Sequence, residues 1–340
     1  MLRRLSILDL SPVAEGSDAT TTLERSIDLA VAAETYGYHR CWLAEHHNAG
    51  GLASSAPEIL IGQIARATKR LRVGAGGMML PNHSALRVAE VFRILSALFP
   101  GRIDLGIGRA PGTDPKTASL LRRGRVVTPA DIEASLGELI GLLTHDDVPR
   151  PAFPQSTIAI PTGVAAPQVW MLGSSDQGAM IAASRGLGFA FAHHMNPEDA
   201  PHEMKRYAEH FRPGLYDAPR GIVSVAAVCA ETEAEAARLA KSQELALLRF
   251  AQGLRDLPFP SVETAEAYPY SEEELSVRAL YETNRVVGSA GSVVEKLREI
   301  AEACQVEEVM IMTHVHDHAA RKRSYELIAS CLWGERRGQA

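Results

Sequence analysis

The chain has 340 residues, of which 46% are hydrophobic and 22% are charged, and its formal net charge is −6. This is the balance of an ordinary globular protein that is long enough to bury a sizeable core. An acidic chain with no dense basic face does not fit a nucleic-acid-binding protein. No apolar run approaches the ~20 residues of a membrane-spanning helix, so we expect no membrane contact either.

The cysteines and the N-terminus indicate the compartment. Four cysteines are widely separated and form no C-x-x-C motif: Cys41, Cys229, Cys304 and Cys331. Thiols spaced in this way fit a reducing environment. The first residues are basic, but Asp9 interrupts the apolar run that a signal peptide requires. We therefore expect a cytoplasmic protein.

Short apolar runs alternate along the chain with longer amphipathic patterns. The predicted strands are Leu5–Leu10, Arg40–Ala44, Leu71–Gly76, Ile103–Gly108, Gln168–Leu172, Gly188–Ala192, Ile222–Cys229 and Glu308–Thr313. Predicted helices follow them at Leu23–Thr35, Pro57–Thr68, Leu86–Phe99, Ile132–Leu143, Gly178–Ser184, Pro197–Phe211, Glu233–Phe250 and Ala319–Cys331. A further pair, Glu272–Asn284 and Val293–Ala303, precedes the last strand. Eight such units favour a closed (β/α)8 TIM barrel over an open doubly wound sheet, in a single domain over residues 1–340.

Local signals mark helix ends and insertions. Four capping-box spacings begin at Thr21, Thr232, Ser271 and Ser292, and Gly37 and Gly186 follow helical stretches. Two Pro-rich segments, Pro111–Pro167 and Gly253–Ser271, interrupt the rhythm. They follow predicted strands four and seven, at the barrel end where active sites lie, so we expect them to act as insertions that cover a site.

Polar residues follow the second predicted strand at once, in the run Trp42-Leu-Ala-Glu-His-His-Asn48. His46 in this run is a candidate for moving protons near neutral pH. The third strand continues into Ala75, Gly76 and Gly77. Consecutive glycines let a flat ligand approach the backbone, and they lower the steric objection to a cis peptide between them.

Two segments are suited to a phosphate. Arg109 follows the fourth strand and is placed to grip a phosphate with two parallel hydrogen bonds. Gly173, Ser174 and Ser175 lie between the fifth strand and a helix, where backbone N–H groups and hydroxyls can hold an anion. The alternative for the two serines is simple N-capping. The run Gly106-x-Gly108 is not a dinucleotide-binding fingerprint, because its third glycine comes late, at Gly112.

Histidines also follow the sixth and eighth strands. His194 lies in the first group, and His314, His316 and His318 form the second. A His-x-His pattern with a nearby acid fits a metal-dependent barrel hydrolase, which stays open as an alternative. The first strand carries no histidine, which weighs against it.

Taken together, these motifs resemble the bacterial luciferase-like flavin-dependent monooxygenases. The resemblance rests on W-L-A-E-H-H-N (42–48), V-G-A-G-G-M-M-L-P-N-H (73–83), G-R-I-D-L-G-I-G-R-A-P-G (101–112) and L-G-S-S (172–175), in this order. It implies a (β/α)8 barrel that binds reduced FMN, supplied by a separate flavin reductase, and that uses O2 to oxidise an unidentified small organic substrate. It also implies a homodimer.

Site residues follow from the same resemblance. It makes His46 the catalytic histidine beside the flavin ring, with Ala75, Gly76 and Gly77 against the ring and a cis bond between the two glycines. Arg109, Gly173, Ser174 and Ser175 match the phosphate grip, and His194 lines the pocket. No metal is expected. The remaining alternatives are a deazaflavin-dependent oxidoreductase and a non-catalytic flavin-binding protein.

Overall fold

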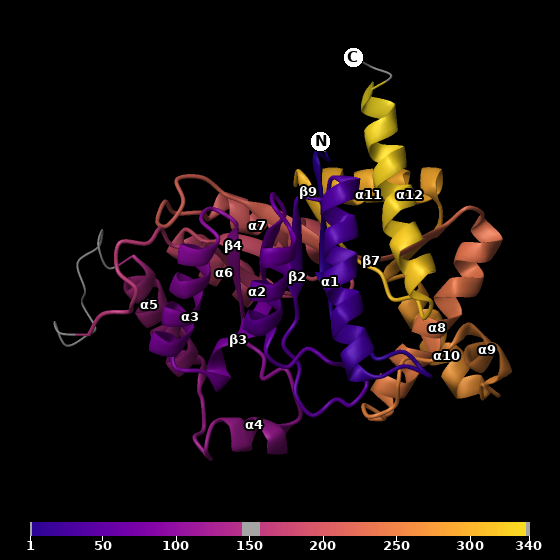
Figure 1. Cartoon of the computed structure of the whole chain (residues 1–340), viewed down its shortest axis with the longest axis horizontal. Coiled ribbons are helices and arrows are strands. Elements are labelled where there is room, and N and C mark those ends of the chain that lie inside the picture. Colours follow the sequence, from indigo (N-terminus) through magenta and orange to yellow (C-terminus); the bar gives the residue numbers. More distant parts are fainter. Residues whose placement is uncertain (1, 145–156, 338–340) are drawn as a thin grey trace.

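The computed structural model describes residues 2–144 and 157–337 (Figure 1). Its strands are β1 (Arg4–Asp9), β2 (Arg40–Leu43), β3 (Arg72–Met79), β4 (Ile103–Gly108), β5 (Gln168–Gly173), β6 (Gly188–Phe191), β7 (Gly221–Ala230), β8 (Arg285–Ser289) and β9 (Glu308–Met312). The α-helices are α1 (Ala19–Tyr36), α2 (Pro57–Ala67), α3 (Ala85–Leu98), α4 (Pro115–Leu121), α5 (Pro129–Leu143), α6 (Asp176–Arg185), α7 (Ala200–Glu209), α8 (Glu233–Ala251), α9 (Val262–Ala267), α10 (Glu272–Glu282), α11 (Ala290–Ala303) and α12 (His318–Arg337). A short 3-10 helix spans Leu80–Asn82.

Eight of these strands form a closed parallel barrel, as the sequence predicts. The sheet order is β6-β5-β4-β3-β2-β1-β9-β7-β8, and an additional pairing of β6 with β7 closes the ring. Every strand pair is parallel. Helices surround the ring, and α12 (yellow) packs beside α1 (indigo), which brings the two ends of the chain together (Figure 1).

One strand was missed by the sequence reading. β8 (Arg285–Ser289) lies between the two helices that were predicted before the last strand, and it pairs only with Ala226–Ala230 of β7. β7 is ten residues long, so its second half projects beyond the barrel and offers β8 an edge. β8 is short and only alternately buried, which leaves it without the continuous apolar run of a barrel strand.

Helix caps were predicted with mixed success. Ser271 and Glu274 form a reciprocal capping box, and the Thr232 hydroxyl accepts a hydrogen bond from the Glu235 N–H. Gly37 and Gly186 end their helices in the left-handed conformation. The predictions at Thr21 and Ser292 are wrong, because α1 begins after Asp18 and α11 begins after Ser289. In both cases an earlier polar residue takes the N-cap position.

The barrel interior is closed towards the N-terminal ends of its strands. The Arg40 guanidinium lies between Asp104, at 2.7 Å, and Glu308, at 2.6 Å, and all three are buried. Above this charged layer, the rings of Trp42 and Trp170 meet edge to face with centroids 5.8 Å apart. These layers fill the barrel interior near the N-terminal ends of the strands, so ligand-binding side chains must come from the C-terminal ends. Within the described chain, no helix combines the length and apolar character that crossing a bilayer requires.

Candidate functional site

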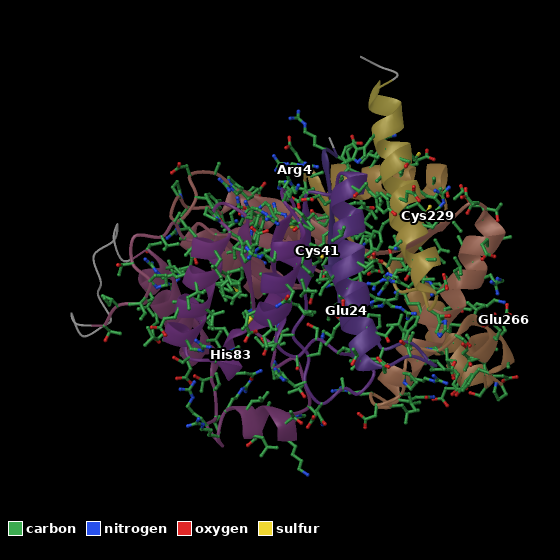
Figure 2. All side chains as sticks on the ribbon, viewed as in Figure 1. Arg4, Glu24, Cys41, His83, Cys229 and Glu266 are labelled. Carbon is green, nitrogen blue, oxygen red and sulfur yellow. The ribbon has the colours of Figure 1, made fainter. Side chains whose placement is uncertain are left out.

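The predicted site residues all follow, or lie within, parallel strands of the barrel. His46 follows β2, Arg109 follows β4, Ser174 and Ser175 follow β5, and His194 follows β6. The C-terminal ends of parallel strands meet at one end of a barrel, so the fold collects these segments there. Figure 2 shows His83, which follows β3, at this same end, on the side of α4.

Arg109 lies over the N-terminus of α6. Its Nη1 donates a hydrogen bond to the Gln177 Oε1 at 3.1 Å, and a Cβ added to Gly178 would lie 3.7 Å from its Nη2. The Nε atom is buried and has no hydrogen-bond partner among the described residues. Burial lowers the pKa of Arg109, while Asp176 opposes the shift. A buried donor without a partner is unusual, and here it accompanies the positive end of a helix dipole.

The two serines before α6 are not used as caps. Ser175 occupies the N-cap position with an extended backbone, yet its side chain makes no capping hydrogen bond. The Ser174 carbonyl oxygen accepts a hydrogen bond from Asn196 Nδ2 at 3.1 Å, which joins the loops after β5 and β6. Gly173 and Gly178 pack closely, since a Cβ on either would lie 3.2 Å from the other's Cα. The capping alternative is therefore met by Ser175 in its backbone position but not in a side-chain hydrogen bond.

The glycine pair lies inside β3 and not at its end. The Gly76–Gly77 peptide bond is cis, as predicted, and β3 continues to Met79 with a register shift between Ala75 and Met78. The Ala75 side chain is buried in the core between the barrel and its helices, so only its backbone remains available to a ligand. A Cβ on Gly76 would lie 2.9 Å from atoms of Leu8 and Trp42.

The surroundings of Gly77 leave no room for a side chain. A Cβ at this position would lie 2.8 Å from the Gly106 carbonyl oxygen of β4. Backbone cannot give way as a flexible side chain does, so we expect Gly77→Ala to destabilise the protein by about 1–3 kcal/mol. Thermal unfolding measures this, with Gly141→Ala as the control, since nothing lies within 4 Å of a Cβ there. Equal melting temperatures for the two variants would contradict the prediction.

His46 lies in a loop that is fixed by its neighbours. Its backbone N–H donates to the Ser54 carbonyl oxygen at 3.0 Å, and the Ser54 hydroxyl donates to the Ala44 carbonyl oxygen at 2.6 Å. The ring is partly exposed, but Nδ1 is buried without a hydrogen-bond partner among the described residues. Burial lowers the pKa of His46, so the ring is neutral at pH 7 and has a nitrogen that can accept a proton.

Glu45 organises the loops around His46. Its Oε1 accepts hydrogen bonds from the Nε2 atoms of His47 and His83, both at 2.8 Å, and its Oε2 accepts from the Met79 N–H at 2.8 Å. The carboxylate is fully buried. This network ties the loop after β2 to the end of β3. The sequence reading placed Glu45 at the active end but did not predict its partners, which depend on how two loops fold over one another.

The Glu45–His83 pair predicts a pH-dependent stability. Burial opposes ionisation of Glu45, but the His83 and Met79 hydrogen bonds outweigh it and lower the pKa of Glu45 below 4.5. Burial also opposes the charge of His83, but Glu45 raises the pKa of His83 above 6.5. The pair therefore stabilises fully between about pH 4.5 and 6.5, and less as pH falls through the Glu45 pKa or rises through the His83 pKa.

Glu45→Gln should therefore cost most in that window, by about 1–3 kcal/mol. The measurement is the difference in melting temperature between the parent and the variant, taken as a function of pH. Glu24→Gln, at an exposed position on α1, is the control. A difference that does not change between pH 5 and pH 9 would show that the pair's charge contributes nothing.

His194 has a fixed orientation. Its Nδ1 donates to the Ser224 carbonyl oxygen at 3.0 Å, and its backbone N–H donates to the same oxygen. The proton is thus held on Nδ1, and Nε2 is left as an acceptor. Burial lowers the pKa of His194, so this ring is also neutral at pH 7.

The three histidines after β9 separate. His316 Nε2 donates to the Glu15 carbonyl oxygen at 2.9 Å, and His318 Nε2 lies 2.7 Å from Asp28 Oδ2. His314 instead lies near His46 and His194, close enough for their charges to affect its pKa. Across residues 2–144 and 157–337, no three His, Cys, Asp or Glu side chains are grouped so that they could hold a metal ion. The three histidines considered as ligands for a metal-dependent hydrolase therefore do not converge.

His314 differs from His316 and His318 in having a buried ring nitrogen without a partner among the described residues. Its ring is partly exposed, but Nε2 is buried and unpartnered among the described residues. Burial lowers the pKa of His314 to about 3. The ring of Phe259, from the insertion after β7, meets it edge to face with centroids 5.9 Å apart. The His-x-His pattern did not separate His314 from His316. Residues two positions apart need not share a partner once the strand has ended.

The insertion after β7 is attached to the loops after β1 and β2. The Phe259 N–H donates to the Val13 carbonyl oxygen at 2.7 Å, and the Glu15 N–H donates to the Phe259 carbonyl oxygen at 2.8 Å. The Val13 N–H donates to the Gly51 carbonyl oxygen at 2.9 Å, and the Gly51 N–H to the Arg255 carbonyl oxygen at 3.1 Å. The segment predicted to cover the site is thus joined by backbone hydrogen bonds to the loops after β1 and β2.

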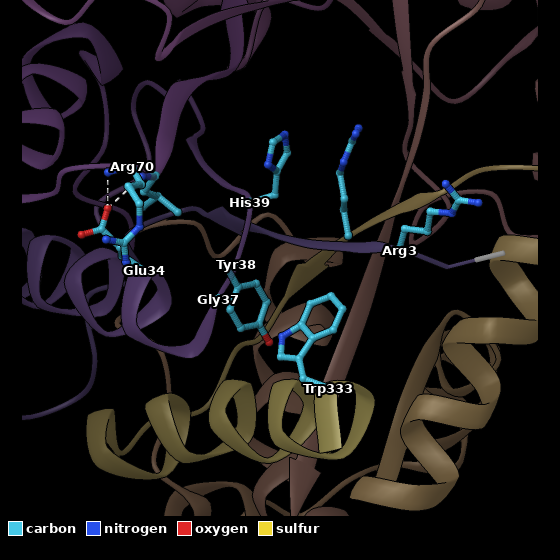
Figure 3. A pocket seen from close by; sticks show the side chains of 9 residues that line it. Arg3, Glu34, Gly37, Tyr38, His39, Arg70 and Trp333 are labelled. Carbon is cyan, nitrogen blue, oxygen red and sulfur yellow. Dashed lines mark hydrogen bonds between the residues drawn. The ribbon is translucent and has the colours of Figure 1, made fainter. Parts of the chain in front are cut away.

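A separate pocket of about 290 Å³ opens at the opposite end of the barrel. Arg3 and His39, which line it, lie at the beginnings of β1 and β2 (Figure 3). The Glu34 carboxylate in this pocket accepts hydrogen bonds from the backbone N–H groups of residues 69–71. This pocket shares no residue with the predicted site.

Known proteins match this chain over nearly its whole length. The family model described as luciferase-like monooxygenase matches residues 3–306. The uncharacterised protein YceB of Bacillus subtilis is 42% identical over 96% of this chain and 98% of its own length. A protein named luciferase-like monooxygenase from Escherichia coli K12 is 37% identical, with 95% of each chain covered. The crystal structure of apo-MsnO8 is 37% identical, covers 97% of this chain and 98% of its own, and superposes with a TM-score of 0.88.

More distant solved structures share the fold. The oxygenating constituent of 3,6-diketocamphane monooxygenase from Pseudomonas putida, in complex with FMN, has a TM-score of 0.72 at 21% identity and covers 97% of each chain. An F420-dependent secondary alcohol dehydrogenase has a TM-score of 0.68 at 13% identity, covering 98% of this chain and 99% of its own. At these identities the likeness concerns the barrel alone.

Proposed function

The chain belongs to the luciferase-like monooxygenase family, and on that premise we propose that it uses reduced FMN and O2 to oxidise a small organic substrate. An oxygenase is what the family and the monooxygenases among its structural neighbours support. The choice of FMN, the residues that hold it and the source of its electrons are parts of the proposal.

We choose a phosphorylated cofactor because Arg109 lies at the N-terminus of α6. Three features fit a phosphate: the unpartnered Arg109 Nε, the uncapped start of α6 and the two serine hydroxyls. An arginine and a helix N-terminus together form a strong anion site. Segments 65 residues apart in the chain meet here because β4 and β5 are neighbours in the barrel.

The remaining residues are assigned by position. When bound, reduced FMN supplies the electrons that activate oxygen. The backbone of Ala75, Gly76 and Gly77 would support the ring, and His194 would present its Nε2 towards the site. His46 would take up or release a proton at Nδ1, because burial keeps its ring neutral. Glu45 would hold the backbone of His46 and the end of β3 in register.

A cofactor titration tests this proposal. We expect the protein to bind FMN more tightly than riboflavin or a deazaflavin, and its reduced FMN complex to react with O2. Tighter binding of a deazaflavin would favour the alternative oxidoreductase. FMN binding without an oxygen reaction faster than that of free reduced FMN would favour a non-catalytic flavin carrier. Because reduced FMN would come from a separate flavin reductase, NADH oxidation should require that the reductase be added.

We propose further that the protein is a homodimer. Large apolar side chains are exposed on neighbouring helices α2 and α3, with 65% of Ile59 and 64% of Leu98 accessible. A second copy is the partner that the family resemblance indicates. We expect Ile59→Glu to shift the mass in solution from dimer to monomer, as measured by light scattering after size exclusion. Phe250→Glu, at an exposed position on α8, is the matched control and should stay dimeric. A monomeric parent protein would refute the proposal. Cys41, Cys229 and Cys304 are buried thiols outside any disulfide, which fits the proposed cytoplasmic location.

A further inference from the structure

We propose that the substrate is an uncharged organic molecule with a carbonyl or hydroxyl oxygen, and that Nε2 of His314 hydrogen-bonds to this oxygen. The inference rests on the proposed function, and it concerns the side of the site that faces β9, β1 and β2. It gives His314 a substrate-binding role beside the proton-transfer role of His46.

Among the described residues, the charged side chains that act on His314 are Arg321 and Asp9, and they are paired with each other. The Arg321 Nη2 lies 2.8 Å from Asp9 Oδ1. Arg321 Nε donates to the Thr313 carbonyl oxygen, next to His314. Glu45 is held by His47, His83 and Met79, and Arg109 is directed at α6.

The imidazoles themselves are neutral. Burial lowers the pKa of His46, His194 and His314, the last to about 3. A charged group brought among them would lose its hydration without gaining an opposite charge, which is costly. An uncharged substrate avoids that cost.

The polar requirement comes from two buried nitrogen atoms. His314 Nε2 and His46 Nδ1 have no hydrogen-bond partner within the described parts of the chain. Buried polar atoms in folded proteins are almost always paired, so a group that belongs to a ligand is the natural partner. His46 already has the proton-transfer role in the proposed function, and His314 is left to fix the substrate.

Apolar side chains also lie in this part of the barrel. Phe259 packs edge to face on His314 and is itself held by backbone hydrogen bonds to Val13 and Glu15. Leu10 and Leu172 are partly exposed above the tryptophan layer of the barrel interior. A substrate with an apolar body and one oxygen atom matches these surroundings.

Three probes of similar size test the proposal: acetophenone, benzoate and benzylamine. Each is titrated into the complex of the protein with oxidised FMN, and the change in flavin absorbance gives Kd. We expect acetophenone to bind at least about tenfold more tightly than either ion. His314→Phe should weaken acetophenone binding by roughly 2- to 12-fold, the loss of one neutral hydrogen bond, and His314→Gln should restore part of it. His316→Phe is the control, because His316 bonds to Glu15 instead.

Several results would overturn the proposal. These are equal or tighter binding of benzoate or benzylamine, no effect of His314→Phe beyond that of His316→Phe, or no binding of acetophenone at all. The Kd for FMN is measured for each variant and should not change. If FMN itself fails to bind the parent protein, the proposed function is wrong. If FMN binds and the probe pattern fails, only the substrate assignment is wrong.

Discussion

Replacing His46 by alanine should slow the oxygen half-reaction of the reduced FMN complex by about 10²- to 10⁴-fold, the usual loss of a general acid or base. The Kd for FMN should stay nearly unchanged, because the proposed role of His46 is proton transfer and not binding. Its loop is fixed through Ser54 and Ala44, so removing the ring leaves the backbone supported.

The pH profile gives a second readout. Burial lowers the pKa of His46, and the neutral ring is the form that accepts a proton. The parent rate should therefore hold as pH falls to 6.5 and decline only below it, and this decline should vanish in His46→Ala. Stopped-flow oxidation of the reduced complex measures both, with His202→Ala, on the exposed side of α7, as the control. Unchanged traces in His46→Ala would remove His46 from the mechanism.

Replacing Arg109 by alanine should raise the Kd for FMN by about 10- to 150-fold, which corresponds to about 1.5–3 kcal/mol for a charge-assisted contact. The phosphate makes this prediction specific. Riboflavin lacks that group, so its Kd should change little, and the variant should lose most of the preference for FMN over riboflavin.

The control for Arg109 lies on the helix that it faces. Arg185 is at the other end of α6, and Arg185→Ala should leave both affinities as they are in the parent. An intermediate loss is expected for Arg109→Lys, which keeps the charge without the planar fork. Equal weakening of FMN and riboflavin in Arg109→Ala would show that the guanidinium does not act on the phosphate.

The sequence predicted the barrel because strands and helices alternate with clear periods. That topology brings Arg109, after β4, to Gln177 and Gly178 at the start of α6, because β4 and β5 are neighbouring parallel strands. The cis bond between Gly76 and Gly77 was also foreseen. The close contact that Gly77 avoids was not foreseen. Its neighbour in space is the β4 backbone, and strand periodicity says nothing about such close approaches.

Hydrogen bonds between loops lay beyond the sequence patterns. The hydrogen-bond partners of Glu45 are His47, His83 and Met79. They are set by the paths of two loops, and no local sequence rule specifies those paths. The separation of His314 from His316 and His318 depends likewise on the turn after β9. β8 exists because β7 is longer than the barrel requires, and strand length is the least certain feature of an apolar run.

The backbone hydrogen bonds that join Val13, Gly51 and Phe259 also bear on how this enzyme could diversify. Loops usually vary and accept insertions more readily than the elements that they connect. Here three loops are joined by one set of backbone hydrogen bonds, so a change in one loop requires matching changes in the other two. A graft of residues 253–271 from a relative would succeed only if its backbone reproduced the bonds to residues 13, 15 and 51. Engineering of substrate choice here therefore has to replace all three loops together.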